Sequence, residues 1–341
     1  QRDAFYARHP NNVIRLDKGM PKASDTAREN THTRAAAYFQ NWMKDGVLKQ
    51  DTNLAFYLTA VTFTIEDKPV TRFGLIARVR LEPFNKGIVL PHEKTFSKVK
   101  TQRLELMKAC HANFSQIFSI FSDQTGILGL LTNAAQDTAP VFEFNDDAGH
   151  HHRLWRIMDP VIHQKVTDAF QDQKLFIADG HHRYETALNY RNWLIENSGP
   201  IGQDHPANFI MMYLCAVQDP GLVILPTHRL LKTIPPAAKQ NFLEKAASWF
   251  DIDTFGFDPA KPDTAKEALN QKMTAGLREH KFGIFFKHSR KFHVLHLKPG
   301  VMDTVFGNNI ADALKELDVI VLTRLIFAEL LDFDDRMMDN H

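Results

Sequence analysis

Cysteine is scarce in this sequence of 341 residues, whose two cysteines, Cys110 and Cys215, both lie among apolar residues. Two such cysteines offer no disulfide framework, which excludes small cross-linked secreted domains and leads us to expect a cytoplasmic protein. An excess of charge of one sign is also lacking, because 41 Lys and Arg residues offset 40 Asp and Glu residues. General nucleic-acid binders carry a basic excess, so nucleic acid is disfavoured as a partner.

Long apolar runs and the common nucleotide-binding motifs are absent as well. No apolar run approaches the ~18 residues of a membrane-spanning helix, and no signal-peptide pattern occurs, so we expect no membrane partner. The sequence contains neither a Walker A motif nor Gly-x-Gly-x-x-Gly, and no set of His, Cys and Asp has zinc-ligand spacing. With 44% hydrophobic residues the chain can still bury a sizeable core, in two or three domains or subdomains.

The spacing of apolar residues predicts an alternation of helices and hairpins. Helices are expected over 33–48, 160–171, 241–250, 264–279 and 310–331, and in a basic stretch that contains Arg103. Strands are expected over 13–16, in hairpins over 55–84 and 141–157, over 209–217 and 222–228, and in a last hairpin over 282–298. Pro235-Pro236 marks a boundary. The order indicates a mixed α and β chain.

The densest group of polar side chains lies in residues 174–191, KLFIADGHHRYETALNYR. The apolar run 175–178 indicates a buried strand, which Asp179 and Gly180 end, and helical spacing begins at His181. The first backbone N–H groups of a helix attract phosphate or carboxylate, and Gly180 lets that backbone come close to a ligand. Asp179 could hold Mg²⁺ or take a proton from a hydroxyl.

A simple turn is the alternative, with Asp179 as the helix cap and the histidines in solvent. That interpretation accounts for an Asp-Gly pair alone. Because His181, His182 and Arg183 follow directly, four polar groups meet at one strand end. This exceeds what capping requires and favours a binding site.

A second polar strand end is predicted at Pro91-His92-Glu93-Lys94, directly after the apolar run 88–90. A carboxylate between a histidine and a lysine can be tuned as a general base, although the four residues alone also fit a solvated turn. If both strands lie in one sheet and point the same way, Glu93 and Asp179 converge on a single cleft.

Two further groups of residues are weaker candidates. His150-His151-His152 lies near a hairpin tip, and we expect no metal there, because neighbouring strand residues point to opposite faces. Thr227-His228-Arg229 is either a third phosphate-facing group or a strand end with a surface arginine. Asp318 and Arg324 in the last predicted helix are interpreted as structural charges.

Six strings spread over nearly the whole chain carry a family resemblance: HPNNVIRL (9–16), TRAAAYFQNWMKDGVL (33–48), LPHEKT (90–95), RLELMKACHANFSQIFSIFSD (103–123), IADGHHRYETALNYR (177–191) and LPTHRLL (225–231). They resemble domain-of-unknown-function family 1015, and the string Ala-Asp-Gly-His-His-Arg-Tyr-Glu-Thr-Ala is highly specific. That family is grouped with the ParB/sulfiredoxin-like superfamily, whose members bind nucleotides at a comparable strand-turn-helix.

Within that superfamily, the ADP-dependent free-serine kinases carry a similar Pro-His-Glu, followed later by Asp-Gly-His-His-Arg. The resemblance implies that Glu93 is the base that activates a substrate hydroxyl and that Asp179 lies beside the transferring phosphate. It also implies that His181, His182 and Arg183 hold phosphate oxygens.

The sequence departs from the family pattern in three places. The family's earlier Ala-Pro-Pro-Tyr-Asp-Val strand and its later Met-Pro-Pro-Lys-Ser-Thr-Phe-Phe segment do not occur here. We therefore expect both ends of the usual domain to lie outside this sequence. Thr323 stands where a histidine is common in the family.

Together these observations predict an α+β fold, with a mixed-sheet ParB/sulfiredoxin-like core and a smaller α/β carboxyl-terminal unit. We expect the truncated family start, a strand and a helix, over 1–49. The core is expected over 50–232 and the carboxyl-terminal unit over 233–341.

The first functional hypothesis is a phosphotransferase that uses ATP or ADP with Mg²⁺ and acts on a small hydroxyl-bearing metabolite, such as the amino acid serine. Phosphoryl transfer needs in-line positioning, charge neutralisation and often a base, and the two strand ends offer candidates for each. The expected site comprises catalytic Glu93 and Asp179, Mg²⁺ on Asp179, substrate on His92, and nucleotide phosphates on Gly180, His181, His182, Arg183, Arg103, His228 and Arg229.

Two other hypotheses remain open at this point. The chain could be a non-catalytic nucleotide-binding sensor, because related domains use bound nucleotide as a switch. Metal-assisted hydrolysis at the histidine clusters would require stoichiometric zinc, which we expect to be absent. The sequence names neither the substrate nor the oligomeric state.

Overall fold

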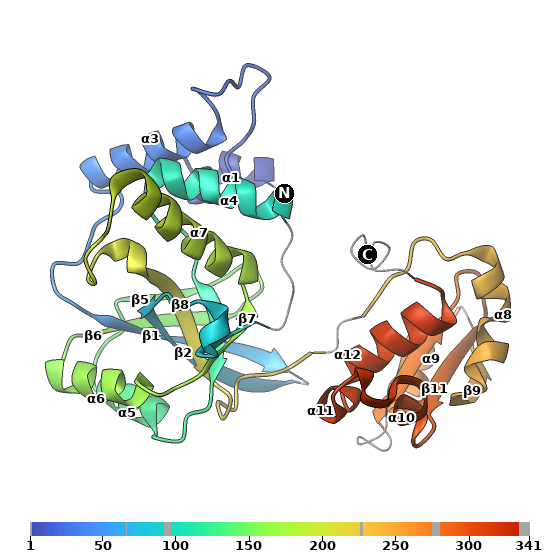
Figure 1. Cartoon of the computed structure of the whole chain (residues 1–341). Helices are drawn as coiled ribbons and strands as arrows, with labels where there is room; N and C mark the ends of the chain where they lie inside the picture. Colours follow the sequence, from blue (N-terminus) through green and yellow to red (C-terminus); the bar gives the residue numbers. More distant parts are fainter. Residues whose placement is uncertain are drawn as a thin grey trace. The chain divides into compact units, whose positions relative to one another are not determined.

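The computed structural model describes residues 2–65, 67–91, 97–225, 228–258, 260–274 and 280–333. The chain divides into a first unit, Gln1–Ile224, and a second unit, Leu225–His341 (Figure 1). Each unit combines helices with a sheet, as expected for an α+β chain. None of the described helices has the length and apolar character that crossing a bilayer requires.

The first unit is built on a large mixed sheet, which has eight strands among the described residues. They are β1 (Phe56–Ile65), β2 (Lys68–Arg80), β3 (Val89–Leu90), β4 (Ile117–Phe121), β5 (Phe142–Asn145), β6 (His151–Ile157), β7 (Leu175–Asp179) and β8 (Phe209–Ala216). Their order across the sheet is β3-β7-β4-β8-β2-β1-β6-β5. The β3/β7 and β4/β8 pairs are parallel and the remaining pairs antiparallel. The predicted hairpins over 55–84 and 141–157 are confirmed.

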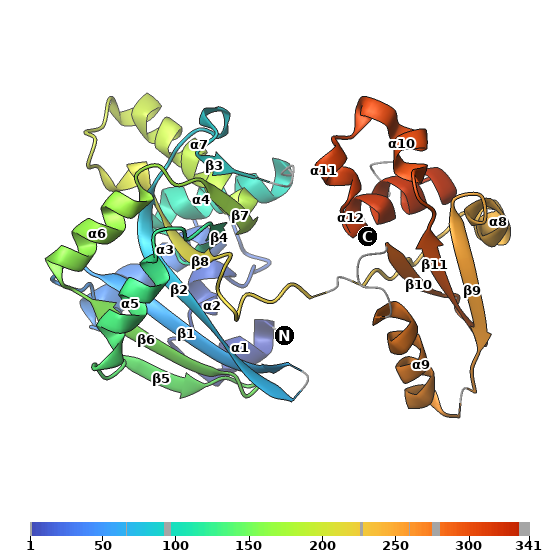
Figure 2. The same ribbon diagram turned by 90° about the horizontal axis from the view of Figure 1, so that it is seen from below.

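Helices of the first unit gather in two groups. They are α1 (Arg2–Arg8), α2 (Ile14–Asp17), α3 (Thr31–Lys44), α4 (Ser97–Cys110), α5 (Ile127–Gln136), α6 (Pro160–Phe170) and α7 (His181–Ser198), with the 3₁₀ turns η1 (Phe84–Lys86) and η2 (Pro206–Asn208). α4 packs against both α3 and α7, while α5 packs against α6 (Figures 1 and 2).

The core of the first unit follows the alternation of side chains along the strands. Along β4, Ile117, Ser119 and Phe121 are buried, and along β7, Leu175 and Ile177 are buried. The residues between them are more exposed. The apolar side chains among these join one hydrophobic cluster with residues of α5, α6 and α7, which fixes the positions of these helices on the sheet.

The second unit has a three-stranded antiparallel sheet among the described residues, in the order β10-β11-β9. Its strands are β9 (Phe250–Gly256), β10 (Lys281–Phe285) and β11 (Lys291–Leu297). Its helices are α8 (Pro236–Ala246), α9 (Pro262–Thr274), α10 (Val301–Phe306), α11 (Asp312–Lys315), α12 (Asp318–Ile320) and the π-helix η4 (Val321–Leu330), with the 3₁₀ turn η3 (Gly307–Asn309). A separate hydrophobic cluster holds this unit together.

Two predicted strands are wrong. Residues 13–16 were expected as a strand, but helix α2 begins at Ile14, whose backbone N–H donates to Oδ1 of Asn12. Residues 222–225 form no strand, although they are apolar. Ile224 is 92% exposed there, so its apolar side chain is not packed against other described residues.

Two predicted helices are also wrong in their extent. The helix expected over 241–250 begins earlier, at Pro236, and ends at Ala246, and strand β9 then starts at Phe250. The closing helix expected over 310–331 is broken. Leu317 has extended backbone angles, which separate α11 from α12 and η4.

The centre of the large sheet depends on a glycine. A Cβ atom at Gly74 in β2 would lie 2.0 Å from Cζ of Tyr213, because the ring of this β8 residue crosses β2. Nε of Arg72 donates a hydrogen bond to the Tyr213 hydroxyl at 3.2 Å. The ring also packs edge-on against Phe118 of β4, with centroids 5.2 Å apart. Tyr213 therefore connects three neighbouring strands.

We expect Gly74→Ala to destabilise the first unit by about 1–3 kcal/mol, because the added methyl group forces the Tyr213 ring to move. Urea unfolding followed by tryptophan fluorescence measures the change. Gly129→Ala is the control, since this residue lies in α5 with nothing within 4 Å of the added carbon. The control should raise the stability by up to about 1 kcal/mol. Equal stability of Gly74→Ala and the unmodified protein would contradict the expectation.

Candidate functional site

β3 and β7 are parallel neighbours in the large sheet. Val89 lies opposite Leu175, and Leu90 lies opposite Phe176. Because the two strands are parallel, the chain leaves β3 in the direction of the carboxyl end of β7, although Leu90 lies opposite Phe176, three residues before Asp179. The two predicted strand ends therefore do share a sheet and a direction. His92 and Glu93 lie outside the described residues, so their closeness to Asp179 stays a prediction.

A glycine turn connects β7 to α7. Gly180 has a φ of +99°, a conformation that favours glycine, and a Cβ there would lie 2.8 Å from Nε of Arg183. α7 begins at His181, runs for 18 residues, and has no side-chain hydrogen bond from its cap residue. The predicted strand, turn and helix are confirmed. The alternative, in which Asp179 caps the helix, is wrong, because the cap residue is Gly180.

Arg183 joins Asp179 to the start of β4. Its Nη2 donates a hydrogen bond to Oδ2 of Asp179, and its Nη1 donates to the carbonyl oxygen of Gln116 at 2.5 Å. The Asp179 side chain is 73% exposed and that of Arg183 is 24% exposed. A carboxylate and a guanidinium group thus lie side by side, open to solvent, at the amino end of α7. This arrangement places a group that can bind a cation, the carboxylate, within four residues of a group that can bind an anion, the guanidinium group.

Tyr184 holds α7 to the segment that leads into β3. The side chain is fully buried, its hydroxyl donates to the carbonyl oxygen of Glu82, and it accepts from the Glu82 amide, both at 2.8 Å. Its ring stacks on Phe84, with centroids 5.2 Å apart. In addition, Nη1 of Arg191 donates to the carbonyl oxygen of Leu81 at 2.9 Å. Burial raises the pKa of Tyr184 to about 12, so the hydroxyl stays a donor at neutral pH.

The remaining predicted phosphate-binding residues of the first unit differ in whether they lie near Asp179. His181, in the first turn of α7, is buried at 4% exposure, and His182 is half-buried. Arg103 on α4 forms an ion pair with Asp17 on α2, which ties these two helices together. His181 and His182 therefore share the turn with Asp179, while Arg103 has a structural partner elsewhere.

His228 and Arg229 belong to the second unit and are exposed. The strand that was expected to present them is absent from the described residues just before them. Gly180 belongs to the first unit, so a contact of these two side chains with phosphate at Gly180 stays a prediction.

A cavity of about 950 Å³ lies beside α7. Its lining includes Ala187, Tyr190 and Leu194 of α7, with His111 at the end of α4. Nδ1 of His111 lies 2.6 Å from the Tyr190 hydroxyl. Ala187 comes seven residues after Gly180, which is about 10 Å along the helix. The sequence analysis missed this cavity, because its lining comes from segments that are far apart in the chain.

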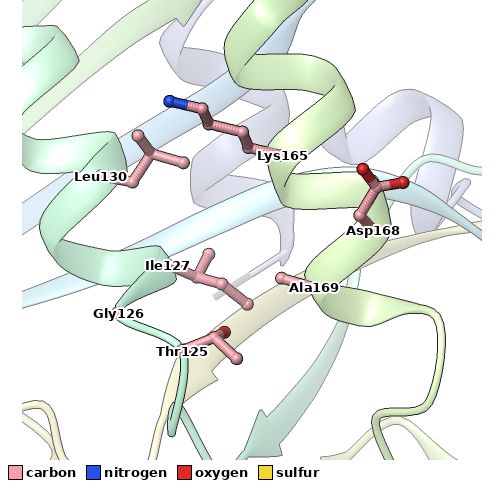
Figure 3. Close-up of a pocket in the computed structure, with 7 residues that line it drawn as sticks. All are labelled: Thr125, Gly126, Ile127, Leu130, Lys165, Asp168 and Ala169. Carbon is pink, nitrogen blue, oxygen red and sulfur yellow. The ribbon is translucent and has the colours of Figure 1, made fainter.

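A smaller pocket of about 380 Å³ lies between α5 and α6. Figure 3 shows Ile127 and Leu130 on one side and Lys165, Asp168 and Ala169 on the other. Its lining contains no residue that the sequence analysis assigned to the site. Both volumes are typical of small-molecule sites. The larger cavity is the better candidate, because residues of α7, the helix that begins at His181, contribute to its lining.

The histidine run has the alternation expected of a strand. His150 and His152 lie on the same side as Asp146, while His151 pairs with Glu143. Three consecutive histidines do not converge, as the sequence indicated. The sequence analysis did not consider Asp146, four residues before His150, as a partner of the two.

Comparison with known proteins assigns the chain to a family. A family model described as "Protein of unknown function (DUF1015)" matches residues 1–320. No curated protein and no solved structure matches the chain. The match spans the whole first unit and most of the second.

We expect Tyr184→Phe to destabilise the first unit by about 1–3 kcal/mol, because the backbone amide and carbonyl of Glu82 lose their partner in a buried position. Tyr57→Phe is the control, since its hydroxyl bonds to Asp51 in an exposed position, and it should cost less. Urea unfolding gives both values. Amide exchange of Leu175, which donates to the Ile88 carbonyl at 2.9 Å, should also become faster in Tyr184→Phe. Unchanged stability and exchange would contradict this role of Tyr184.

Proposed function

We propose that this chain, which belongs to the DUF1015 family of proteins of unknown function, is a nucleotide-dependent phosphotransferase that acts on a small hydroxyl-bearing metabolite. The observation that carries the proposal is the parallel pairing of β3 and β7. It points the chain that leaves Leu90 toward the end of β7 where Asp179 and Gly180 lie. Phosphoryl transfer needs a base and a phosphate site at one place, and this edge supports both.

The amino end of α7 is the proposed phosphate site. Backbone N–H groups and the positive end of the helix dipole attract phosphate there. Because Gly180 has no Cβ, the Arg183 guanidinium group lies directly against this turn. Arg183 would neutralise charge on the transferring group, with His181 and His182 as further ligands of phosphate oxygens. The exposed carboxylate of Asp179 suits Mg²⁺, which binds through one or two carboxylates and the substrate phosphates.

In the proposed reaction, the hydroxyl oxygen of the metabolite attacks the terminal phosphorus of ATP or ADP. Glu93 takes the hydroxyl proton while His92 contacts the substrate. The bond between that phosphorus and the bridging oxygen breaks, and the electron pair stays on the departing nucleotide. We place the nucleoside in the cavity along α7, where Tyr190 and His111 offer aromatic faces.

The finer parts of the proposal come from the motif order. Pro-His-Glu followed by Asp-Gly-His-His-Arg supports a ParB/sulfiredoxin-like core, a likeness to the ADP-dependent serine kinases, and serine as the first metabolite to test. The scarcity of cysteine supports a cytoplasmic setting.

Isothermal titration of the full chain with ATP and with ADP, each with Mg²⁺, tests the proposed nucleotide site. We expect binding, and a loss of affinity of about tenfold or more in Asp179→Asn, because the amide removes the charge that holds Mg²⁺. Asp172→Asn is the control, since Asp172 is exposed and lies before the opposite end of β7. No binding at millimolar nucleotide would contradict the proposal.

A product analysis separates a kinase from a sensor. The chain is incubated with Mg²⁺, nucleotide and pooled hydroxyl metabolites that include serine, and phosphorylated products are identified by mass spectrometry. We expect one product, and a rate about 10²–10⁴-fold lower in Glu93→Gln with nucleotide binding retained. Nucleotide binding without any phosphorylated product would instead assign the chain to the sensors.

A further inference from the structure

Three ligand-type side chains converge at the turn of the β5–β6 hairpin. Asp146 lies in the turn after β5, and His150 and His152 lie at the beginning of the returning chain. Oδ2 of Asp146 is 3.3 Å from Nδ1 of His150 and 3.0 Å from Nε2 of His152. The three ligand atoms all lie within 4.8 Å of one another. Two imidazole nitrogens are thus directed at one carboxylate oxygen.

The turn itself orients this carboxylate. Oδ1 of Asp146 accepts hydrogen bonds from the backbone N–H groups of Ala148 and His150, both at 2.9 Å. Oδ2 is therefore left on the side of the two imidazoles.

Both imidazole rings are held by aromatic neighbours. His152 stacks on Phe144, with centroids 4.9 Å apart and ring planes at 5°. Phe63 of β1 packs edge-on against His150, with centroids 5.9 Å apart. Donors that are fixed before a ligand arrives lose less entropy on binding it. The three side chains are still 29–44% exposed, so an ion and a water molecule can reach them.

We propose that Asp146, His150 and His152 bind a divalent transition-metal ion, and that Zn²⁺ fits them best. Imidazole nitrogen and carboxylate oxygen bind zinc at about 2.0–2.2 Å. Ligands at that distance around a tetrahedral ion lie about 3.3 Å apart, close to the two separations at Asp146 Oδ2. Three protein ligands and one water complete the coordination. Two imidazoles disfavour Mg²⁺, so this site differs in chemistry from the one proposed at Asp179.

His151 provides a matched control within the same run. Its Nε2 lies 2.9 Å from Oε1 of Glu143, and it is not part of the cluster of Asp146, His150 and His152. It has the same chemistry and a similar exposure, at 37% against 44% for His150. A variant at His151 therefore changes the histidine content of the hairpin without removing a proposed ligand.

The experiment uses the full chain, treated with a chelator and then freed of it. Isothermal titration with ZnCl₂ should give one equivalent of tightly bound zinc, and CoCl₂ should produce the visible bands of tetrahedral Co²⁺. We expect Asp146→Asn, His150→Ala and His152→Ala each to lower the zinc affinity at least about tenfold. His151→Ala should leave it within about twofold. Circular dichroism confirms that each variant is folded.

Three results would overturn the proposal. The first is no zinc binding by the unmodified chain. The second is an equal loss of affinity in His151→Ala, which would assign binding to the hairpin histidines in general. The third is unchanged affinity in the double variant His150→Ala/His152→Ala, which would show that the ion binds elsewhere. Loss of the Co²⁺ bands in folded His150→Ala, with the bands retained in His151→Ala, would support it independently.

Discussion

The two hydrogen bonds between Tyr184 and the backbone of Glu82 are the interaction on which the candidate phosphotransfer site depends. β3 has only two residues and lies at the edge of the sheet, so its pairing with β7 contributes few hydrogen bonds of its own. Tyr184 lies one turn into α7, and α7 follows β7 directly through Gly180. The same helix that carries the proposed phosphate site therefore also holds the chain that enters β3.

The sequence was sufficient for the local parts of this site. An apolar run, a glycine and a helical pattern predicted β7, the turn and α7, because each depends on neighbouring residues. The sequence could not establish that β3 and β7 are parallel. Between Leu90 and Leu175 lie 84 residues, and the described part of them contains three other strands. The failure at 222–225 has a related cause. Ile224 is apolar but exposed, and a composition pattern does not show which segments find a packing partner.

The metal site shows what a pattern of consecutive residues leaves out. Because successive side chains of a strand point to opposite faces, His151 points away from its two neighbours. The same alternation brings His150 and His152, two residues apart, to one side. The third ligand depends on the turn, in which Gly149 has a φ of +82° and Asp146 accepts backbone hydrogen bonds. Residues 146–152 thus form a cluster only after the hairpin closes. A search for Asp four residues before a His-x-His pair across a glycine turn would have found it.

The exposed pair of Asp179 and Arg183 acquires a role within the proposed reaction. Without nucleotide, the two side chains neutralise each other, and an exposed ion pair of this kind contributes only about 0–1 kcal/mol. Arrival of a magnesium nucleotide offers each of them a stronger partner, Mg²⁺ for the carboxylate and phosphate for the guanidinium group. Because Nη1 of Arg183 is also held by the Gln116 carbonyl, the guanidinium group stays at the amino end of α7 during the exchange. The pair therefore keeps both charges in position while leaving them available to a ligand.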